Sequence, residues 1–130
     1  MTETMTIDKL FGPKVEQFAV LKCDKGAHNK VYIIMIVNAR RAKVVMRFWG
    51  ALKPHGNLGW KIEHKLSDFD ALIEAKMNKK DASDSYELVS EEELMMSFQK
   101  EGVYFEFVRQ ICRVISNYED DKVGMLSRSV

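Results

Sequence analysis

The sequence predicts an α+β protein in which an antiparallel four-stranded sheet is crossed by one helix and followed by a C-terminal two-helix extension. Three observations lead to this fold class. Four segments rich in β-branched and aromatic residues follow one another before residue 66. From residue 67 the spacing of apolar residues changes to three or four, which is the helical period. A chain of 130 residues suits one small domain with an appendage.

The four strands are expected in succession, each bounded by a polar or glycine-containing turn. Residues 15–23 alternate in part between apolar and polar positions, and residues 31–37 are a dense run of Val, Ile, Tyr and Met. Residues 43–49 form the third strand. After a loop that contains proline and glycine, residues 60–65 place charged side chains on one face only. This pattern is typical of a sheet with one exposed side.

Three helices are expected after the sheet. Ser67, three residues before Asp70, is a weak form of the capping box and predicts the first helix start. Ser90 and Glu93 have the full capping-box spacing and predict the second. Residues 103–118 keep apolar side chains at a spacing of three to four. This third helix is too apolar to stand exposed, so we expect it to pack on the sheet, on its neighbour or on a second copy.

The chain divides into an N-terminal arm (1–14), an α+β domain (15–89) and an acidic helical extension (90–130). Residues 1–80 carry 15 Lys or Arg against 8 Asp or Glu, and residues 81–130 carry 5 against 11. The small net charge of +1 is therefore the sum of +7 in residues 1–80 and −6 in residues 81–130. Such asymmetry indicates an anion-binding front or is a fluctuation of surface charge.

Composition narrows the class of protein. Apolar residues make up 46% and charged residues 30% of the chain, and no apolar run approaches the roughly 18 residues of a membrane helix. The first residues lack the pattern of a secretory signal, so we expect an intracellular protein, cytoplasmic if the source is prokaryotic or viral. Cys23 and Cys112 are the only cysteines and lie in apolar patterns, which favours buried thiols.

Neither catalysis nor a metal is indicated by the sequence. No nucleophile elbow, phosphate-binding loop or dinucleotide fingerprint occurs. His28, His55 and His64 lack the spacing of zinc ligands. We therefore expect a non-enzyme with no cofactor and no metal.

The strand over residues 43–49 ends in a Trp-Gly pair that leads into a basic loop. Trp49 shares a strand face with Lys43 and Arg47, because alternate residues of a strand point the same way. An aromatic ring beside cations is typical of nucleic-acid binding; a core Trp and a solvated charged face are the alternatives. Trp60 is expected in the core. The candidate nucleic-acid-binding residues are Lys43, Arg47, Trp49, Gly50, Lys53, His55, Asn57 and Lys61.

The region from about residue 15 to 89 resembles the WGR domain family, named for a Trp-Gly-Arg motif followed by an aliphatic residue and later by Gly and an amide. The matching positions are Trp49, Gly50, Leu52, Gly56 and Asn57, with Tyr32 on an upstream strand and residues 67–72 at a helix entry. Ala51 replaces the motif Arg, and Lys53 replaces the first loop Gly. In poly(ADP-ribose) polymerases of this family the domain binds broken DNA ends and relays that state to a catalytic region. Without the Arg, the resemblance does not by itself imply the relay.

Two functions follow from these features. The first is a non-catalytic module that binds nucleic acid, preferably DNA at ends or single-stranded stretches, with Trp49 stacking and cations on phosphates. The second is an adaptor or inhibitor that docks on a partner enzyme, or on a second copy, through the helical extension. Its contact residues are expected to be Tyr104, Val108, Ile111 and Ile115. A free-standing module of this kind suits a bacterial or phage protein.

Overall fold

A computed structural model describes residues 11–12, 14–23, 29–39, 42–54, 56–78, 86–119 and 127–128. The strands are β1 (Val15–Cys23), β2 (Lys30–Asn38), β3 (Lys43–Ala51), β4 (Gly59–Glu63), β5 (Glu87–Val89) and β6 (Ser127–Arg128). The helices are α2 (Asp68–Met77), α3 (Glu91–Lys100) and α4 (Tyr104–Glu119).

The strands form one antiparallel sheet in the order β5-β1-β2-β3-β4-β6. The α+β class is confirmed, and the four predicted strands make the centre of the sheet. The predicted count of four strands is too low, because β5 and β6 add short edges. Each edge strand has only two or three residues, too few to show a period of two in the sequence.

A β-bulge changes the face on which β1 begins. The pairing runs Val15 to Val37 and then Gln17 to Ile36, so one extra residue is inserted in β1. Simple alternation along β1 would place Val15 and Leu21 on the same face of the sheet. Instead Val15 packs in one apolar cluster and Leu21 in the cluster on the other side of the sheet.

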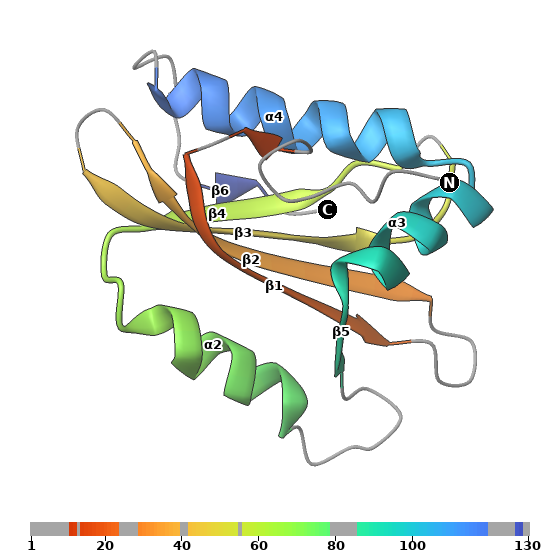
Figure 1. The fold of residues 1–130 in the computed structure, drawn as a ribbon, viewed down its shortest axis with the longest axis horizontal. Helices are drawn as coiled ribbons and strands as arrows, with labels where there is room; N and C mark the ends of the chain where they lie inside the picture. The colour runs from red at the N-terminus through yellow and green to blue at the C-terminus, as the bar shows by residue number, and fades with distance from the viewer. Residues whose placement is uncertain are drawn as a thin grey trace.

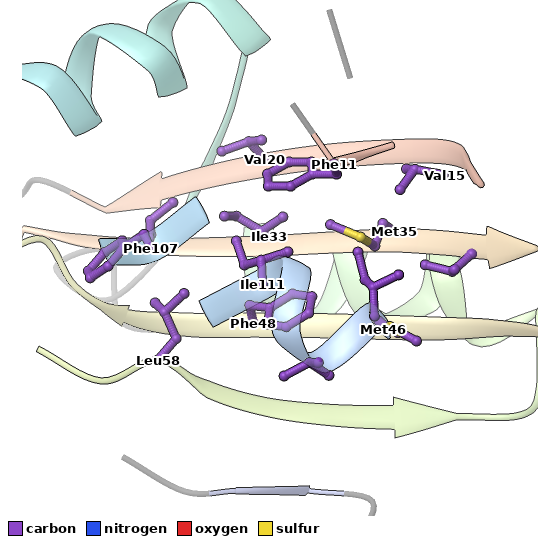
Figure 2. Packing of buried hydrophobic residues seen from close by; sticks show 14 of the residues in the cluster. Phe11, Val15, Val20, Ile33, Met35, Met46, Phe48, Leu58, Phe107 and Ile111 are labelled. Atoms are coloured by element: carbon purple, nitrogen blue, oxygen red, sulfur yellow. The ribbon is translucent and has the colours of Figure 1, made fainter. Parts of the chain in front are cut away.

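The larger hydrophobic core lies between one face of the sheet and α4. Phe107 and Ile111 of α4 are fully buried and belong to the same cluster as Ile33 of β2 and Phe48 of β3 (Figure 2). Trp60 packs against this cluster, as predicted. The cluster joins residues from both the predicted domain 15–89 and the predicted extension 90–130. The apolar stripe of α4 therefore stabilises the sheet itself.

A smaller core lies on the opposite face, where α2 packs on β1 and β2 (Figure 1). Phe69 is the buried residue of α2, and Leu72 and Ile73 are partly buried. Tyr32 and Ile34 of β2 supply the floor. Because α2 packs on β1 and β2 only, the charged side chains of β3 and β4 on the same face lie beside the helix and not beneath it.

The two predicted helix caps have different outcomes. Ser90 is the N-cap of α3, and its hydroxyl accepts a hydrogen bond from the Glu93 amide at 3.1 Å. Ser67 precedes α2 in a helical conformation and makes no side-chain cap bond. Both predicted helix starts are confirmed, because Ser67 and Ser90 each directly precede a helix. The predicted side-chain cap is present at Ser90 and missing at Ser67, whose backbone lacks the extended geometry that a cap requires.

Two further predictions concern the ends of the chain and the membrane. Residues 1–10 and 13 of the predicted arm lie outside the described residues, and Phe11 is buried in the larger core. Among the helices that the structure describes, none is long and apolar enough to cross a membrane.

Candidate nucleic-acid interface

Four of the predicted site residues lie on one face of the sheet. Lys43, Arg47 and Trp49 alternate along β3, and Lys61 on β4 is the register partner of Arg47. Glu63 on β4 shares this face. We call these five residues the β3–β4 surface. It continues the face that α2 covers over β1 and β2, and Lys43 and Trp49 mark ends about 20 Å apart along the strand.

The indole of Trp49 rests on the backbone of β4. Gly59 is its register partner, and a Cβ added there would lie 2.5 Å from the Nε1 and Cε2 atoms of the ring. Only glycine leaves room for the ring in this position. The indole is half-buried against the smaller core, and the Arg47 guanidinium carbon lies 5.7 Å from the ring centroid, within range of a cation–π contact. Trp49 is therefore neither a core residue nor a free ring.

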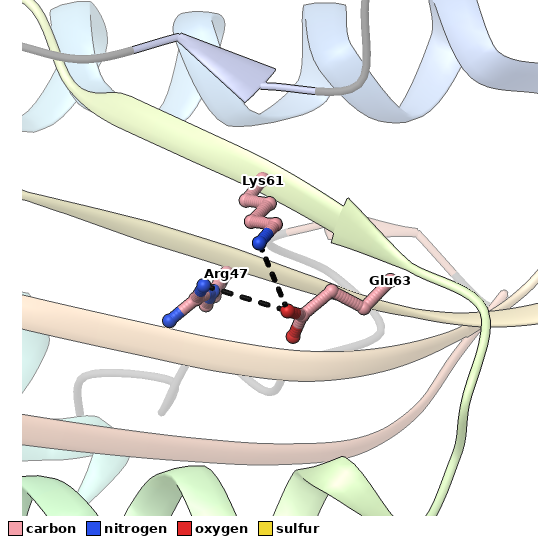
Figure 3. A network of polar contacts seen from close by, with 3 residues as sticks. All are labelled: Arg47, Lys61 and Glu63. Atoms are coloured by element: carbon pink, nitrogen blue, oxygen red, sulfur yellow. Dashed lines mark hydrogen bonds and ion pairs between the residues drawn. The ribbon is translucent and has the colours of Figure 1, made fainter.

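Carboxylates accompany all three cations of the β3–β4 surface. Glu63 Oε1 lies 3.5 Å from Arg47 Nη2 and 3.4 Å from Lys61 Nζ (Figure 3). Glu16 Oε2 lies 3.0 Å from Lys43 Nζ. The contacts of Glu63 are longer than a good charge-assisted hydrogen bond, and the Lys43 pair is open to solvent on both sides. These pairs reduce the positive charge of the surface, and the exposed Lys43–Glu16 pair is weak enough to exchange for another anion.

Polar atoms without partners are buried beneath this surface. Among the residues that the structure describes, Tyr32 Oη, Arg47 Nε and Glu63 Oε2 find no hydrogen-bond partner, although the Tyr32 residue is only 1% exposed. Burial raises the pKa of Tyr32, and the nearby Arg47 guanidinium partly opposes this without reaching hydrogen-bond geometry. Lys76 of α2 lies 5.0 Å above the Tyr32 ring. These donor and acceptor atoms lie beneath the surface near the indole and are not open to solvent.

Three further predicted binding residues, Gly50, Lys53 and Asn57, are not part of the β3–β4 surface. Gly50 points to the opposite face, where an added Cβ would be 3.1 Å from Leu58 Cδ2, so it serves packing. Lys53 and Asn57 are exposed in the loop between β3 and β4. His55 lies outside the described residues. The predicted set is thus divided between a sheet face and a loop.

The predicted protein-contact residues of α4 are mostly covered. Ile111 and Ile115 are buried in the larger core at 0% and 8% exposure, and Tyr104 and Val108 are partly buried against it. Their apolar stripe is satisfied by the sheet of the same chain, so Ile111 and Ile115 are not available to a partner. Phe105 is instead 76% exposed, and the apolar pattern of the helix did not predict this exposure.

A basic pocket that the sequence analysis missed lies between the β3–β4 loop and α4. Its volume is about 280 Å³, and its lining residues are Gly56, Asn57, Glu106, Arg109, Gln110 and Arg113. Arg109 and Arg113 are four residues apart, and residues at this spacing lie on one side of a helix. This spacing was the sequence signal from which the pocket's paired charges could have been predicted. The overall acidity of residues 81–130 obscured it.

Two chemical features bear on other functions. In the described part of the chain, no group of three or more His, Cys, Asp or Glu side chains is arranged to hold a metal. Cys23 and Cys112 are not joined in a disulfide, Cys23 is buried, and burial raises the pKa of the Cys112 thiol. No protein-family model, curated protein or solved structure matches this chain.

Proposed function

We propose that this protein is a non-catalytic module that binds single-stranded nucleic acid, DNA in the first instance, on the β3–β4 surface. The observation that carries the proposal is the half-buried indole of Trp49, seated on Gly59 at the part of the sheet beside α2. Membership in the WGR family, and with it a preference for DNA ends, remains a prediction.

Stacking is the main expected source of affinity. Bases stack on aromatic rings and on arginine guanidinium planes, at about 1–3 kcal/mol per base by alanine substitution. Trp49 and Arg47 adjoin each other with a separation of 5.7 Å between ring centroid and guanidinium carbon. Every base has a face that can stack on such groups, so the proposed binding tolerates any base and suits a single strand better than a closed duplex.

Phosphate contacts are expected to be few and exchangeable. Lys43, Arg47 and Lys61 each have a carboxylate neighbour, and binding requires a phosphate to replace it. Exposed ion pairs contribute about 0–1 kcal/mol, so exchange at the exposed Lys43–Glu16 pair costs little. Arg47 and Glu63 are partly buried, so separating them costs more. Three such contacts on a single strand predict a slope of about −2 in log affinity against log salt.

Tryptophan fluorescence provides a direct test. A Trp60→Phe variant leaves Trp49 as the reporter, and a Trp49→Phe variant leaves Trp60, which packs on the opposite face of the sheet. Titration with an unlabelled thymidine oligomer should quench the Trp49 reporter and leave the Trp60 reporter unchanged. In anisotropy with labelled strands, Trp49→Ala should weaken binding about 5- to 150-fold.

Two results would refute the proposal: equal quenching of both reporters, or binding that is insensitive to salt and to Trp49→Ala. Parallel titrations with RNA and with blunt duplex DNA rank the type of nucleic acid. Circular dichroism of each variant confirms that the sheet is intact.

A second candidate is a protein-interaction adaptor, favoured by one observation. Phe105 lies on the rim of a cavity of about 460 Å³ with Gln99, Gly102 and Tyr104, and Met96 of α3 is 68% exposed. Exposed aromatic residues beside a cavity are typical of contact sites between proteins. Light scattering distinguishes the two functions: a stable dimer that Phe105→Ser converts to monomer, without any affinity for oligonucleotides, supports the adaptor.

A further inference from the structure

A side-chain amide joins the β3–β4 loop to α4 at the basic pocket. Gln110 Oε1 accepts a hydrogen bond from the Leu58 amide at 2.8 Å, and its Nε2 donates to the Gly56 carbonyl at 3.0 Å. Both bonds span more than fifty residues of sequence. They hold the backbone of residues 56–58 against the helix, so one wall of the pocket is fixed in place before any ligand arrives.

The opposite wall carries two positive charges. Arg109 and Arg113 are exposed and lie one helical turn apart on α4, where like charges repel. Between described residues, no ion pair involves either arginine, in contrast to the three cations of the β3–β4 surface. Asn57 of the loop also lines the pocket. Its one carboxylate, Glu106, has an interaction of its own.

We propose that this pocket is a binding site for a phosphate group. Two guanidinium forks match the shape of phosphate oxygens and its charge of about −1.5 to −2 as a monoester. A volume of about 280 Å³ accommodates the phosphate and part of the attached group. An anion between Arg109 and Arg113 removes their repulsion. The site is separate from Trp49, because α4 covers the opposite face of the sheet.

The phosphate can come from a free ester or from a nucleic-acid backbone. The test is two-dimensional nuclear magnetic resonance of the isotope-labelled full chain, including the arginine Nε signals, at constant ionic strength. The probes are inorganic phosphate, adenosine monophosphate and a thymidine oligomer without terminal phosphates, with sodium chloride as the control titrant. We expect phosphate and the monophosphate to shift the signals of Gly56, Asn57, Arg109 and Arg113.

Substitutions make the assignment specific. Arg109→Gln and Arg113→Gln should each weaken binding of the monophosphate about tenfold or more, because each removes a charged donor. Lys65→Gln removes one exposed positive charge beyond the far end of β4 and should change nothing. All three positions are exposed, and thermal unfolding checks that the variants remain folded.

Both sources support the proposal and are told apart by competition. If the oligomer shifts the same signals and competes with the monophosphate, the natural ligand is a backbone phosphate. If only the monophosphate binds, the ligand is a small phosphate ester. The proposal is overturned if no pocket signal moves at concentrations that saturate a site of about 1 mM affinity, or if Lys65→Gln weakens binding as much as the arginine variants. Trp49→Ala leaves this result unchanged, so failure here and failure at the β3–β4 surface are distinguishable.

Discussion

Replacing Gly59 by alanine tests directly whether the Trp49 indole rests on β4. The added methyl carbon would lie 2.5 Å from Trp49 Nε1 and 2.8 Å from Cζ2, far inside van der Waals contact. The ring is rigid and its neighbour is strand backbone, so the indole must swing away from β4. The variant is therefore expected to lose the packing between Trp49 and the sheet.

The sign of the change in the free energy of unfolding distinguishes contact with the Trp49 ring from simple strand propensity. Glycine inside a strand costs about 0.5–1 kcal/mol relative to alanine, so an unobstructed Gly59→Ala change would stabilise the protein. Overpacking a filled site costs about 1–3 kcal/mol. We expect net destabilisation of about 1–2 kcal/mol in the free energy of unfolding.

A double-mutant cycle completes the test. In a Trp49→Ala background the methyl group meets no ring, so Gly59→Ala should be neutral or stabilising by about 0.5 kcal/mol. Urea unfolding followed by circular dichroism measures all four proteins without relying on tryptophan emission. If Gly59→Ala stabilises the parent protein, or costs the same with and without Trp49, the indole does not rest on β4 and the proposed stacking surface loses its basis.

Three further predictions concern other parts of the molecule. Ser90→Ala should lower the free energy of unfolding by about 1 kcal/mol, because it removes the cap bond of α3, whereas Ser67→Ala should change it little. Tyr32→Phe should be neutral or stabilising by about 1 kcal/mol, because a buried hydroxyl without a partner is removed. Because the pKa of Tyr32 is raised in the folded state, its effect on the free energy of unfolding is constant below the ordinary pKa of 10.0, and stability falls as pH rises above that value. Tyr32→Phe removes this loss, so the variant should also resist alkaline unfolding better. Glu63→Gln should raise the affinity for a single-stranded oligomer about two- to fivefold, because two cations are freed.

Each of these predictions has a result that contradicts it. Equal losses from the two serine variants in urea unfolding would show that α2 is capped as α3 is. A large loss of stability in Tyr32→Phe would mean that the hydroxyl has a partner in solution. For Glu63→Gln, weaker binding in anisotropy would show that the carboxylate contacts the nucleic acid; unfolding curves would exclude a loss of fold.

Local pattern was enough to predict most of the elements. The bounds of β1 were predicted because apolar alternation starts after a Gly-Pro pair and stops at a polar turn, and β2 is a dense β-branched run. The capping box at Ser90 predicted where α3 begins, since a cap is a contact between residues three apart. The shared face of Arg47 and Trp49 followed from alternation alone.

The features that sequence reasoning missed depend on contacts between distant segments. A strand of three residues such as β5 is defined only by its pairing with β1. The stripe on α4 indicated burial without indicating what would cover it, so packing of Ile111 on the sheet and contact with a partner were both left open, and the exposure of Phe105 was not predicted. The pocket beside Arg109 and Arg113 exists because Gln110 binds a loop more than fifty positions earlier in the chain.

The sequence by itself determined the α+β class, the central strands, two charged halves and the order of cations and indole along β3. These depend on periods of two and 3.6 and on composition, which are properties of neighbouring residues. The tertiary structure alone decided that Glu63 lies beside Arg47 and Lys61, that Gly59 receives the Trp49 ring, and that the final helix covers the sheet of its own chain. The physical reason is that charge pairing, close approach and burial depend on distances across the fold, which adjacent residues do not encode.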